Sequence, residues 1–333
     1  AKLSIANVES GDTLVVNGLG GNDTIDASTI KAGQAKLTLN GGDGDDIIRG
    51  STGDDLVLGG RGNDTALMGA GNDTFVWNPG DGNDIVEGQS GTDTLKFVGS
   101  NATENMNISA NGGRARLTRD VANITMDLNG VENIDVAALG GTDTITVNDL
   151  TGTNVKEVAI DLGGTAGGAG DGQLDTIILN ATSGDDVITI TNNNGVVTVK
   201  GLGEDVTIRG FDATDRIVIN GLGGDDVINA SGFTGMLVTA NGGDGDDVLI
   251  GSAGNDVLTG GLGDDVLLGG GGQDVLDGGP GDNVVINGFV GNAAILGQFM
   301  ASTFVSTGDG LGATPISDPQ AGQQPVLSIP QHA

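Results

Sequence analysis

Residues 242–286 read GGDGDDVLI, GSAGNDVLT, GGLGDDVLL, GGGGQDVLD and GGPGDNVVI, which are nine-residue units in direct succession. Each unit has the form G-G-x-G-x-D-x-U-x, where U is a large apolar residue. Glycine accepts positive φ at little steric cost, so the first six positions predict a turn. The last three predict one short strand of a stacked parallel sheet. Repetition at a fixed period therefore predicts an all-β solenoid whose units pack only on their neighbours.

A second block of such units occupies residues 41–96. It reads GGDGDDIIR, GSTGDDLVL, GGRGNDTAL and MGAGNDTFV, and after a two-residue slip it resumes as PGDGNDIVE and GQSGTDTLK. Two units would close one flattened coil, and coils would stack about 4.8 Å apart. The apolar residues expected to point inward are Ile48, Val57, Phe75, Val86, Leu249, Leu258, Leu267 and Leu276.

The turns predict metal sites built from oxygen atoms alone. A glycine-rich turn exposes its carbonyl oxygens, and the Asp at the sixth position adds a carboxylate. Calcium accepts six to eight oxygens in irregular geometry, whereas magnesium demands a stricter octahedron. The pairs expected to share an edge of the solenoid are Asp46 with Asp64, Asp55 with Asp73, Asp247 with Asp265, and Asp256 with Asp274.

The candidate calcium ligands come from the first, third and sixth positions of the units. An isolated Asp in such a turn would be read as a solvated residue that caps its own backbone. Carboxylates in register on two edges favour ligands instead. The candidates are Gly41, Asp43, Asp46, Gly50, Asp55, Gly59, Asp64, Asp73, Asp84, Asp93, Gly242, Asp244, Asp247, Gly251, Asp256, Gly260, Asp265, Gly269 and Asp274.

Departures from the pattern limit this assignment. Asn283 replaces the Asp of the last unit and is expected to end the array. The turns between the blocks contain too little Gly for an ion to be assigned. Their acidic residues are Asp143, Asp175, Asp186, Asp205 and Asp215.

The units at 41–96 and 242–286 resemble the RTX (repeats-in-toxin) calcium-binding family. The resemblance implies a right-handed parallel β-roll with several Ca²⁺ ions in its turns, which folds when calcium binds. It also implies export from a Gram-negative bacterium by a type I secretion system that reads an uncleaved C-terminal signal. We therefore expect a secreted protein, extracellular or at the cell surface.

Composition supports a chain that needs cations. Acidic residues number 45 against 13 basic ones, which gives a formal net charge of -32. Such a charge repels itself and disfavours compact states unless cations neutralise it. Nucleic acid is an improbable partner because its phosphates are repelled too. Arg114, Arg116 and Arg119 form the densest basic group and predict a solvated strand face. Cysteine is absent, which excludes disulfides and thiolate metal sites.

The chain divides into segments by composition. A longer period overlies the short one, because the text at 12–28 returns at 215–231 and, more weakly, from Ile134. Helical spacing at Ile295–Phe304 predicts a short helix that caps the solenoid, the alternative being that it docks onto a neighbour. No apolar run is long enough to span a bilayer. The expected segments are 1–40 (entry repeat), 41–96 (first block), 97–240 (degenerate solenoid), 241–287 (second block) and 288–333 (helix and tail).

Catalytic patterns are lacking, and the chain is predicted not to be an enzyme. The single His, His332, excludes H-E-x-x-H and a Ser-His-Asp triad. Neither G-x-S-x-G nor a phosphate-binding G-x-x-x-x-G-K-[ST] occurs. Paired acids could serve a glycosidase, but their recurrence in every turn suits ligands better.

Two functions fit these observations. The first is a secreted, non-catalytic calcium-binding scaffold with an adhesive, matrix or surface-coat role. Its partners would be a cell-surface or matrix polysaccharide, or further copies stacked end to end through open strand edges. The second is the C-terminal calcium-binding module of a larger secreted exoenzyme, such as a protease, a lipase or a polysaccharide-modifying enzyme. A catalytic domain encoded upstream of Ala1 would decide for the second.

Overall fold

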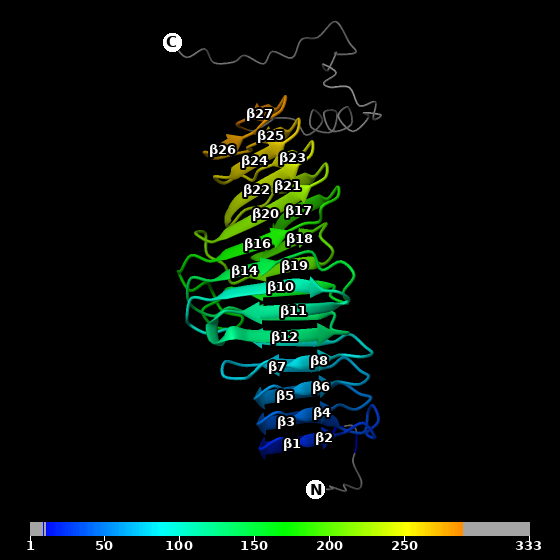
Figure 1. Ribbon diagram of the computed structural model, residues 1–333. Helices are drawn as coiled ribbons and strands as arrows, with labels where there is room; N and C mark the ends of the chain where they lie inside the picture. Colours follow the sequence, from blue (N-terminus) through cyan, green and yellow to red (C-terminus); the bar gives the residue numbers. More distant parts are fainter. Residues whose placement is uncertain (1–8, 10, 289–333) are drawn as a thin grey trace, which may run out of the picture. The chain divides into compact units, whose positions relative to one another are not determined.

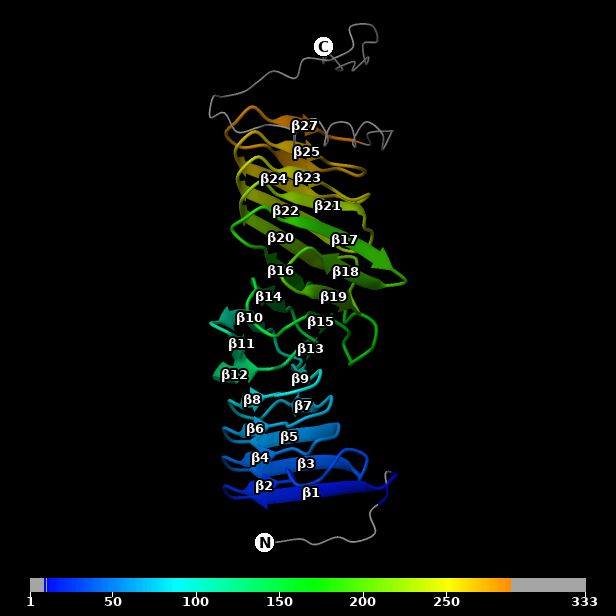
Figure 2. The ribbon, with the colours of Figure 1, turned by 90° about the vertical axis from the view of Figure 1, so that its right-hand side faces the viewer.

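The computed structural model describes residue 9 and residues 11–288. The helix expected at Ile295–Phe304 and the tail after it lie outside the described residues. Within them the protein is an all-β solenoid, as predicted, with two sheets and one short 3₁₀ helix, η1 (Val121–Asn123). The chain alternates between the sheets as it ascends, so each pair of strands closes one coil (Figure 1, Figure 2).

The first sheet, called sheet A, has 14 strands. In spatial order they are β1 (Thr13–Gly20), β3 (Lys36–Asp43), β5 (Asp55–Arg61), β7 (Thr74–Trp77), β9 (Thr94–Val98), β13 (Asn133–Ala137), β15 (Glu157–Asp161), β19 (Asp205–Arg209), β18 (Val196–Lys200), β17 (Val187–Asn193), β21 (Val227–Gly232), β23 (Val248–Ile250), β25 (Val266–Leu268) and β27 (Val284–Ile286).

The second sheet, sheet B, has 13 strands. In spatial order they are β2 (Thr24–Asp26), β4 (Ile47–Arg49), β6 (Thr65–Leu67), β8 (Ile85–Glu87), β12 (Ile124–Asn129), β11 (Arg114–Arg119), β10 (Asn105–Asn111), β14 (Thr144–Val147), β16 (Thr176–Asn180), β20 (Arg216–Gly223), β22 (Leu237–Asp244), β24 (Val257–Leu262) and β26 (Val275–Asp277).

Parallel pairing stacks equivalent residues of successive coils. Leu39 pairs with Val57, and Val57 pairs with Phe75 one coil further on. Alternate strand residues point to opposite faces, so one apolar position per unit suffices to fill the space between the sheets. The inward positions predicted from the repeat are confirmed: Ile48, Val57, Phe75, Val86, Leu249, Leu258 and Leu267 are fully buried, and Leu276 is partly buried against the same core.

Two antiparallel insertions interrupt the parallel stack. In sheet B, β10, β11 and β12 form a meander between β8 and β14, and in sheet A, β17, β18 and β19 do the same between β15 and β21 (Figure 1). In each meander the chain returns toward the preceding coil before the solenoid resumes. The segment 97–240 is therefore solenoid with inserted hairpins, a feature that alternation of apolar residues does not distinguish from further parallel rungs.

The two copies of the long repeat occupy opposite sheets. Strand β1 lies in sheet A, whereas its sequence counterpart β20 lies in sheet B. The same exchange holds for β3 and β22, which open the two nonapeptide blocks. The second block is thus offset from the first by half a coil.

Candidate metal sites

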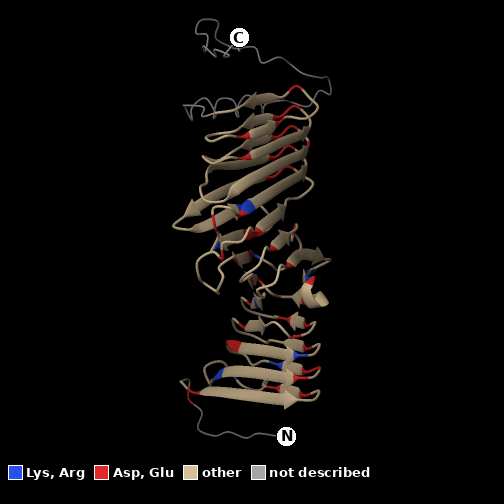
Figure 3. Ribbon diagram, turned by 90° about the vertical axis from the view of Figure 1, so that its left-hand side faces the viewer, with Lys and Arg blue, Asp and Glu red and all other residues tan. Residues whose placement is uncertain are grey.

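The sixth-position acids form ladders along both edges of the solenoid. The N–H of Asp46 donates to Oδ1 of Asp64 at 2.7 Å, and on the other edge the N–H of Asp55 donates to Oδ1 of Asp73 at 2.8 Å. The ladders run Asp23–Asp46–Asp64–Asp84, Asp55–Asp73–Asp93–Glu132, Glu104–Asp143–Asp175–Asp215, Asp186–Asp226–Asp247–Asp265–Asn283 and Asp256–Asp274. The structure therefore brings each predicted pair onto one edge. Figure 3 shows acidic residues recurring in successive turns of the solenoid.

One oxygen of most of these carboxylates is buried without a hydrogen-bond partner among the described residues. Asp46 and Asp247 are each 1% exposed, and Oδ1 of each carboxylate accepts an N–H of the neighbouring coil. A buried anionic oxygen without a partner is costly, and a bound cation would remove that cost. The predicted ligands with such an oxygen are Asp46, Asp64, Asp73, Asp84, Asp93, Asp247, Asp265 and Asp274.

The first Gly of each unit makes room beside that oxygen. A Cβ placed on Gly41 would collide with Oδ2 of Asp46 and would lie 2.6 Å from the carbonyl oxygen of Gly59. In the second block a Cβ on Gly242 would collide with Oδ2 of Asp247 and lie 2.7 Å from the carbonyl oxygen of Gly260. Only glycine therefore lets a carboxylate oxygen and the carbonyl of the next coil converge. The same relation to a carboxylate oxygen and a carbonyl oxygen holds for Gly50, Gly251 and Gly260, whereas a Cβ on Gly59 or Gly269 would collide with the carboxylate of Asp64 or Asp274.

Burial makes the ionised form of these acids costly in the absence of a cation. It raises the pKa of Asp73, Asp84 and Asp247 to about 7. It raises the pKa of Asp64 and Asp93 to about 6. Neighbouring carboxylates raise these pKa values further, while the backbone N–H of the adjacent coil opposes the shift. At neutral pH the ladders thus favour either protons or metal cations.

Asp55 and Asp256 differ from the other candidates because a serine contacts their carboxylates. The N–H of Ser51 donates to Oδ2 of Asp55 at 2.5 Å, and its hydroxyl donates to Oδ1 at 3.0 Å. Ser252 contacts Asp256 in the same way, at 2.5 and 2.9 Å. Asp55 and Asp256 are each the first member of a ladder. No acid residue of the preceding coil therefore donates its backbone N–H to their carboxylates. A serine in the second position of the unit replaces that donor.

Asp43 and Asp244 lie outside the ladders. Both side chains are exposed at strand ends, and their carbonyls accept N–H groups of Gly21 and Gly224 at 2.7 and 2.9 Å. The fifth position of the unit forms an exposed ladder of its own, in which Asn63 N–H donates to Asp45 Oδ1 at 2.8 Å. Where a turn has acids at both the fifth and the sixth position, their roles therefore differ. The sixth-position acid is buried and faces the neighbouring turn, and the fifth-position acid is exposed and accepts a backbone N–H of the next coil.

Sequence reasoning missed several members of the ladders. Asp23, Asp143 and Asp226 also carry a buried oxygen without a partner in the described part of the chain. Glu204, and not its neighbour Asp205, is the buried acid of its turn, and burial raises its pKa to about 7. Their signal is an acid two residues before a buried apolar residue, as in Asp143-Thr144-Ile145. That signal remains in the unit of Asp143, where Ala138 replaces the first Gly.

The donor set fits calcium. No group of three or more His, Cys, Asp or Glu side chains that could hold a metal occurs within the described residues. Each ion would instead be held by the carboxylates of Asp46 and Asp64, or of Asp247 and Asp265, together with carbonyl oxygens of the glycine turns. A set with few anionic and many neutral oxygens suits a large, hard cation that tolerates irregular geometry.

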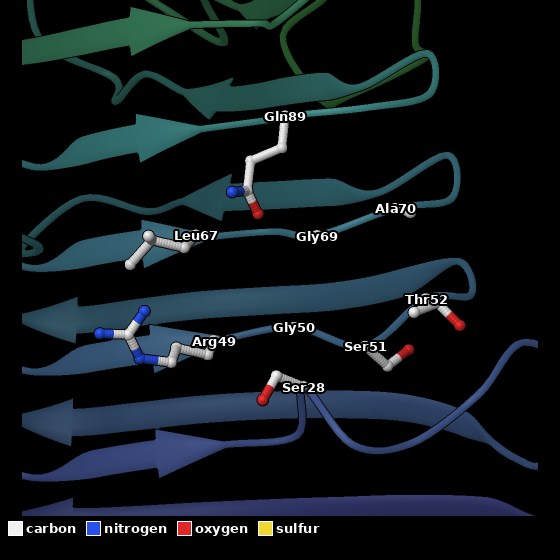
Figure 4. A pocket seen from close by; sticks show the side chains of 9 residues that line it. All are labelled: Ser28, Arg49, Gly50, Ser51, Thr52, Leu67, Gly69, Ala70 and Gln89. Carbon is white, nitrogen blue, oxygen red and sulfur yellow. The ribbon is translucent and has the colours of Figure 1, made fainter.

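A shallow hollow beside the turn of Gly50 and Ser51 is lined mainly by residues outside the ladders. Its volume is about 340 Å³. Figure 4 shows the labelled side chains that line it on successive coils, with Ser28 below Arg49 and Gln89 above. Its lining contains no carboxylate, thiol or imidazole: Ser28, Arg49, Gly50, Ser51, Thr52, Leu67, Gly69, Ala70 and Gln89. It therefore offers neither an acid-base pair nor a calcium cage.

Comparison with known proteins bears on the repeats alone. A family model of the RTX calcium-binding nonapeptide repeat matches four times, at residues 40–75, 80–95, 241–276 and 260–289. No curated protein matches the chain. Within the part of the chain described, no helix has the length and hydropathy of a membrane span. The matched residues include Asp46, Asp64, Asp247 and Asp265, whose ladders continue into parts of the chain that the family model does not match. The chain is therefore a β-solenoid with RTX calcium-binding nonapeptide repeats.

Proposed function

We propose that this protein is a secreted, non-catalytic scaffold whose two nonapeptide blocks fold when they bind calcium outside the cell. The observation that carries the proposal is the series of buried carboxylate oxygens without a hydrogen-bond partner in the described residues. With a net charge of -32 the chain repels itself, and each calcium ion removes part of that repulsion. Each site stabilises the fold by about 2.7 kcal/mol at a calcium concentration 100 times its Kd.

Secretion would supply the change of conditions that this mechanism needs. RTX calcium-binding repeats, which this chain carries in four matched copies, are typical of secreted proteins. A chain that stays open at low calcium and closes at high calcium would fold after export from a Gram-negative cell. Its repetitive ladders suit a structural role at a cell surface or in a matrix, because every turn performs the same task.

End-to-end association is part of the proposed scaffold role. Among the described strands, β1 and β2 at one end and β26 and β27 at the other pair on one side only. Each of these four terminal strands is parallel to its neighbour in the sheet. The last strands of one solenoid could therefore pair in parallel with the first strands of another. Unpaired backbone groups of such edges invite pairing with a second chain.

A calcium titration followed by circular dichroism and light scattering tests these proposals together, with magnesium as the control cation. We expect sheet content to appear with calcium and not with equal magnesium, and scattering to rise once the coils have formed. Full sheet content in chelator would refute calcium-driven folding. Sheet formation without a rise in scattering would refute the association alone.

A further inference from the structure

The acid of one degenerate unit is paired with an arginine. Residues 99–107 read GSNATENMN, so Glu104 stands where other units have Asp. Its N–H donates to Oδ1 of Asp143 at 2.8 Å, as in the ladders. A Cβ on Gly99 would lie 2.6 Å from Oε2 of Glu104, which matches the relation of Gly242 to Asp247. Glu104 is fully buried.

The meander of sheet B places Arg119 below this acid. Antiparallel pairing of β10 with β11 sets Met106 opposite Arg119, and the guanidinium reaches Glu104. Nε of Arg119 donates to Oε1 at 2.8 Å, and a second guanidinium nitrogen contacts the same oxygen. Ser100 completes the set, since its hydroxyl donates to Oε1 at 2.6 Å and its N–H to Oε2 at 3.2 Å. Both carboxylate oxygens therefore have partners.

Aromatic rings cover the guanidinium. The Arg119 Cζ lies 5.4 Å from the centroid of the Trp77 ring, and Trp77 stacks on Phe97 with centroids 4.3 Å apart. Trp77 is fixed in turn by its Nε1–H, which donates to the Gly82 carbonyl at 2.8 Å. The Arg119 side chain is only 3% exposed. The prediction of a solvated strand face is therefore wrong for Arg119, which points into the solenoid.

We propose that Arg119 is an internal cation that neutralises Glu104 in place of calcium. The coil of β9 and β10, together with the meander behind it, then closes without a metal ion. The result is a calcium-independent folding core between two calcium-dependent blocks. The calcium dependence of the two blocks rests on the proposed function. The neutralisation of Glu104 by Arg119 does not.

Hydrogen exchange of the full chain, followed by mass spectrometry in chelator and in calcium, tests the inference. In chelator we expect peptides spanning β9 to β11 to exchange at least ten times more slowly than block peptides that lie outside β9, at residues 41–93 and 241–287. In calcium all of them should be protected. Rapid exchange of β9 to β11 in chelator would overturn the internal cation. Slow exchange of the blocks in chelator would instead overturn the proposed function.

Three variants separate charge balance from simple packing. Arg119→Met leaves Glu104 buried and unpaired, so protection of β9 to β11 in chelator should fall at least tenfold. Adding Glu104→Gln to it removes the buried charge and should restore most of that protection. Arg114→Met is the matched control, because Arg114 lies in the same strand and pairs with Glu87 and Asp127 but is 28% exposed. It should change protection less than threefold.

The outcomes are decisive even if Arg119→Met does not fold. In that case the doubly substituted chain decides, since it lacks both charges and keeps the side-chain lengths. Protection of β9 to β11 in its chelator-treated form supports the inference. Loss of protection there, or wild-type protection in Arg119→Met alone, overturns it.

Discussion

At the scale of single residues, the first Gly of a unit matters because it has no side chain. In Gly242→Ala the new methyl group would occupy the space between Oδ2 of Asp247 and the carbonyl of Gly260. We expect the free energy of unfolding in calcium to fall by about 2 to 3 kcal/mol, the contribution of one lost site. Gly223→Ala is the control, because its Cβ meets nothing closer than 3.6 Å. Denaturant titrations in calcium give both free energies of unfolding. Equal losses in the two variants would contradict a calcium site between Asp247 and the Gly260 carbonyl.

The negative charge of a ladder acid should favour folding in calcium and oppose it in chelator. Asp265→Asn keeps an acceptor for the N–H of Asp247, as Asn283 does for Asp265 one coil further on. In chelator at pH 8 circular dichroism should show more sheet in the variant than in the wild type, because burial raises the pKa of Asp265 and ionisation opposes folding. In saturating calcium it should be less stable. The control Asp264→Asn removes an exposed charge, and the sign change should be absent there.

Much of this residue-level chemistry could be predicted from the sequence. The pairing of Asp46 with Asp64 follows from two nine-residue units per coil, and Gly41 follows from the turn. Arg119 could not be found this way, because an arginine at an alternating strand position is usually solvated. Only the antiparallel return of β11 places it beneath Glu104, and alternation does not distinguish that return from a parallel rung.

At the scale of the turns, the ladders predict an unusual dependence on pH. Between about pH 4, the unfolded value for Asp, and about pH 7, the folded value for Asp73 and Asp247, the folded chain binds more protons than the unfolded chain. Stability without calcium is therefore greatest at low pH and falls as pH rises through this window. Melting temperatures in chelator should decrease from pH 5 to pH 8. A flat or rising profile would contradict the buried ladders.

The serine-capped turns predict a loss that calcium does not repair. Ser252→Ala removes the hydroxyl donor to Asp256 at the start of a ladder. A hydrogen bond to a charged group contributes about 1.5 to 3 kcal/mol, and we expect a destabilisation of that size even in saturating calcium. Thermal unfolding in saturating calcium measures it. Ser231→Ala, which alters an exposed serine bonded to Asn229, should cost less than half as much.

At the scale of the whole molecule, simple salt should not replace calcium. The charges that oppose folding are buried, and mobile ions screen buried charges far less than exposed ones. Chelator-treated protein in 1 M NaCl, a concentration chosen to shorten the Debye length to about 3 Å, should therefore keep the low sheet content that we expect in chelator without salt. Circular dichroism decides this. Recovery of the calcium spectrum in NaCl alone would mean that surface repulsion, rather than burial, opposes folding.

The half-coil offset between β1 and β20 bears on how such a protein can lengthen. A duplication of a single nine-residue unit moves every later strand to the opposite sheet, yet the second block keeps its core and its acid ladders after that exchange. Equivalent units of the repeat can therefore form strands of either sheet. The gene can gain or lose units one at a time, odd numbers included, and still encode a chain that closes.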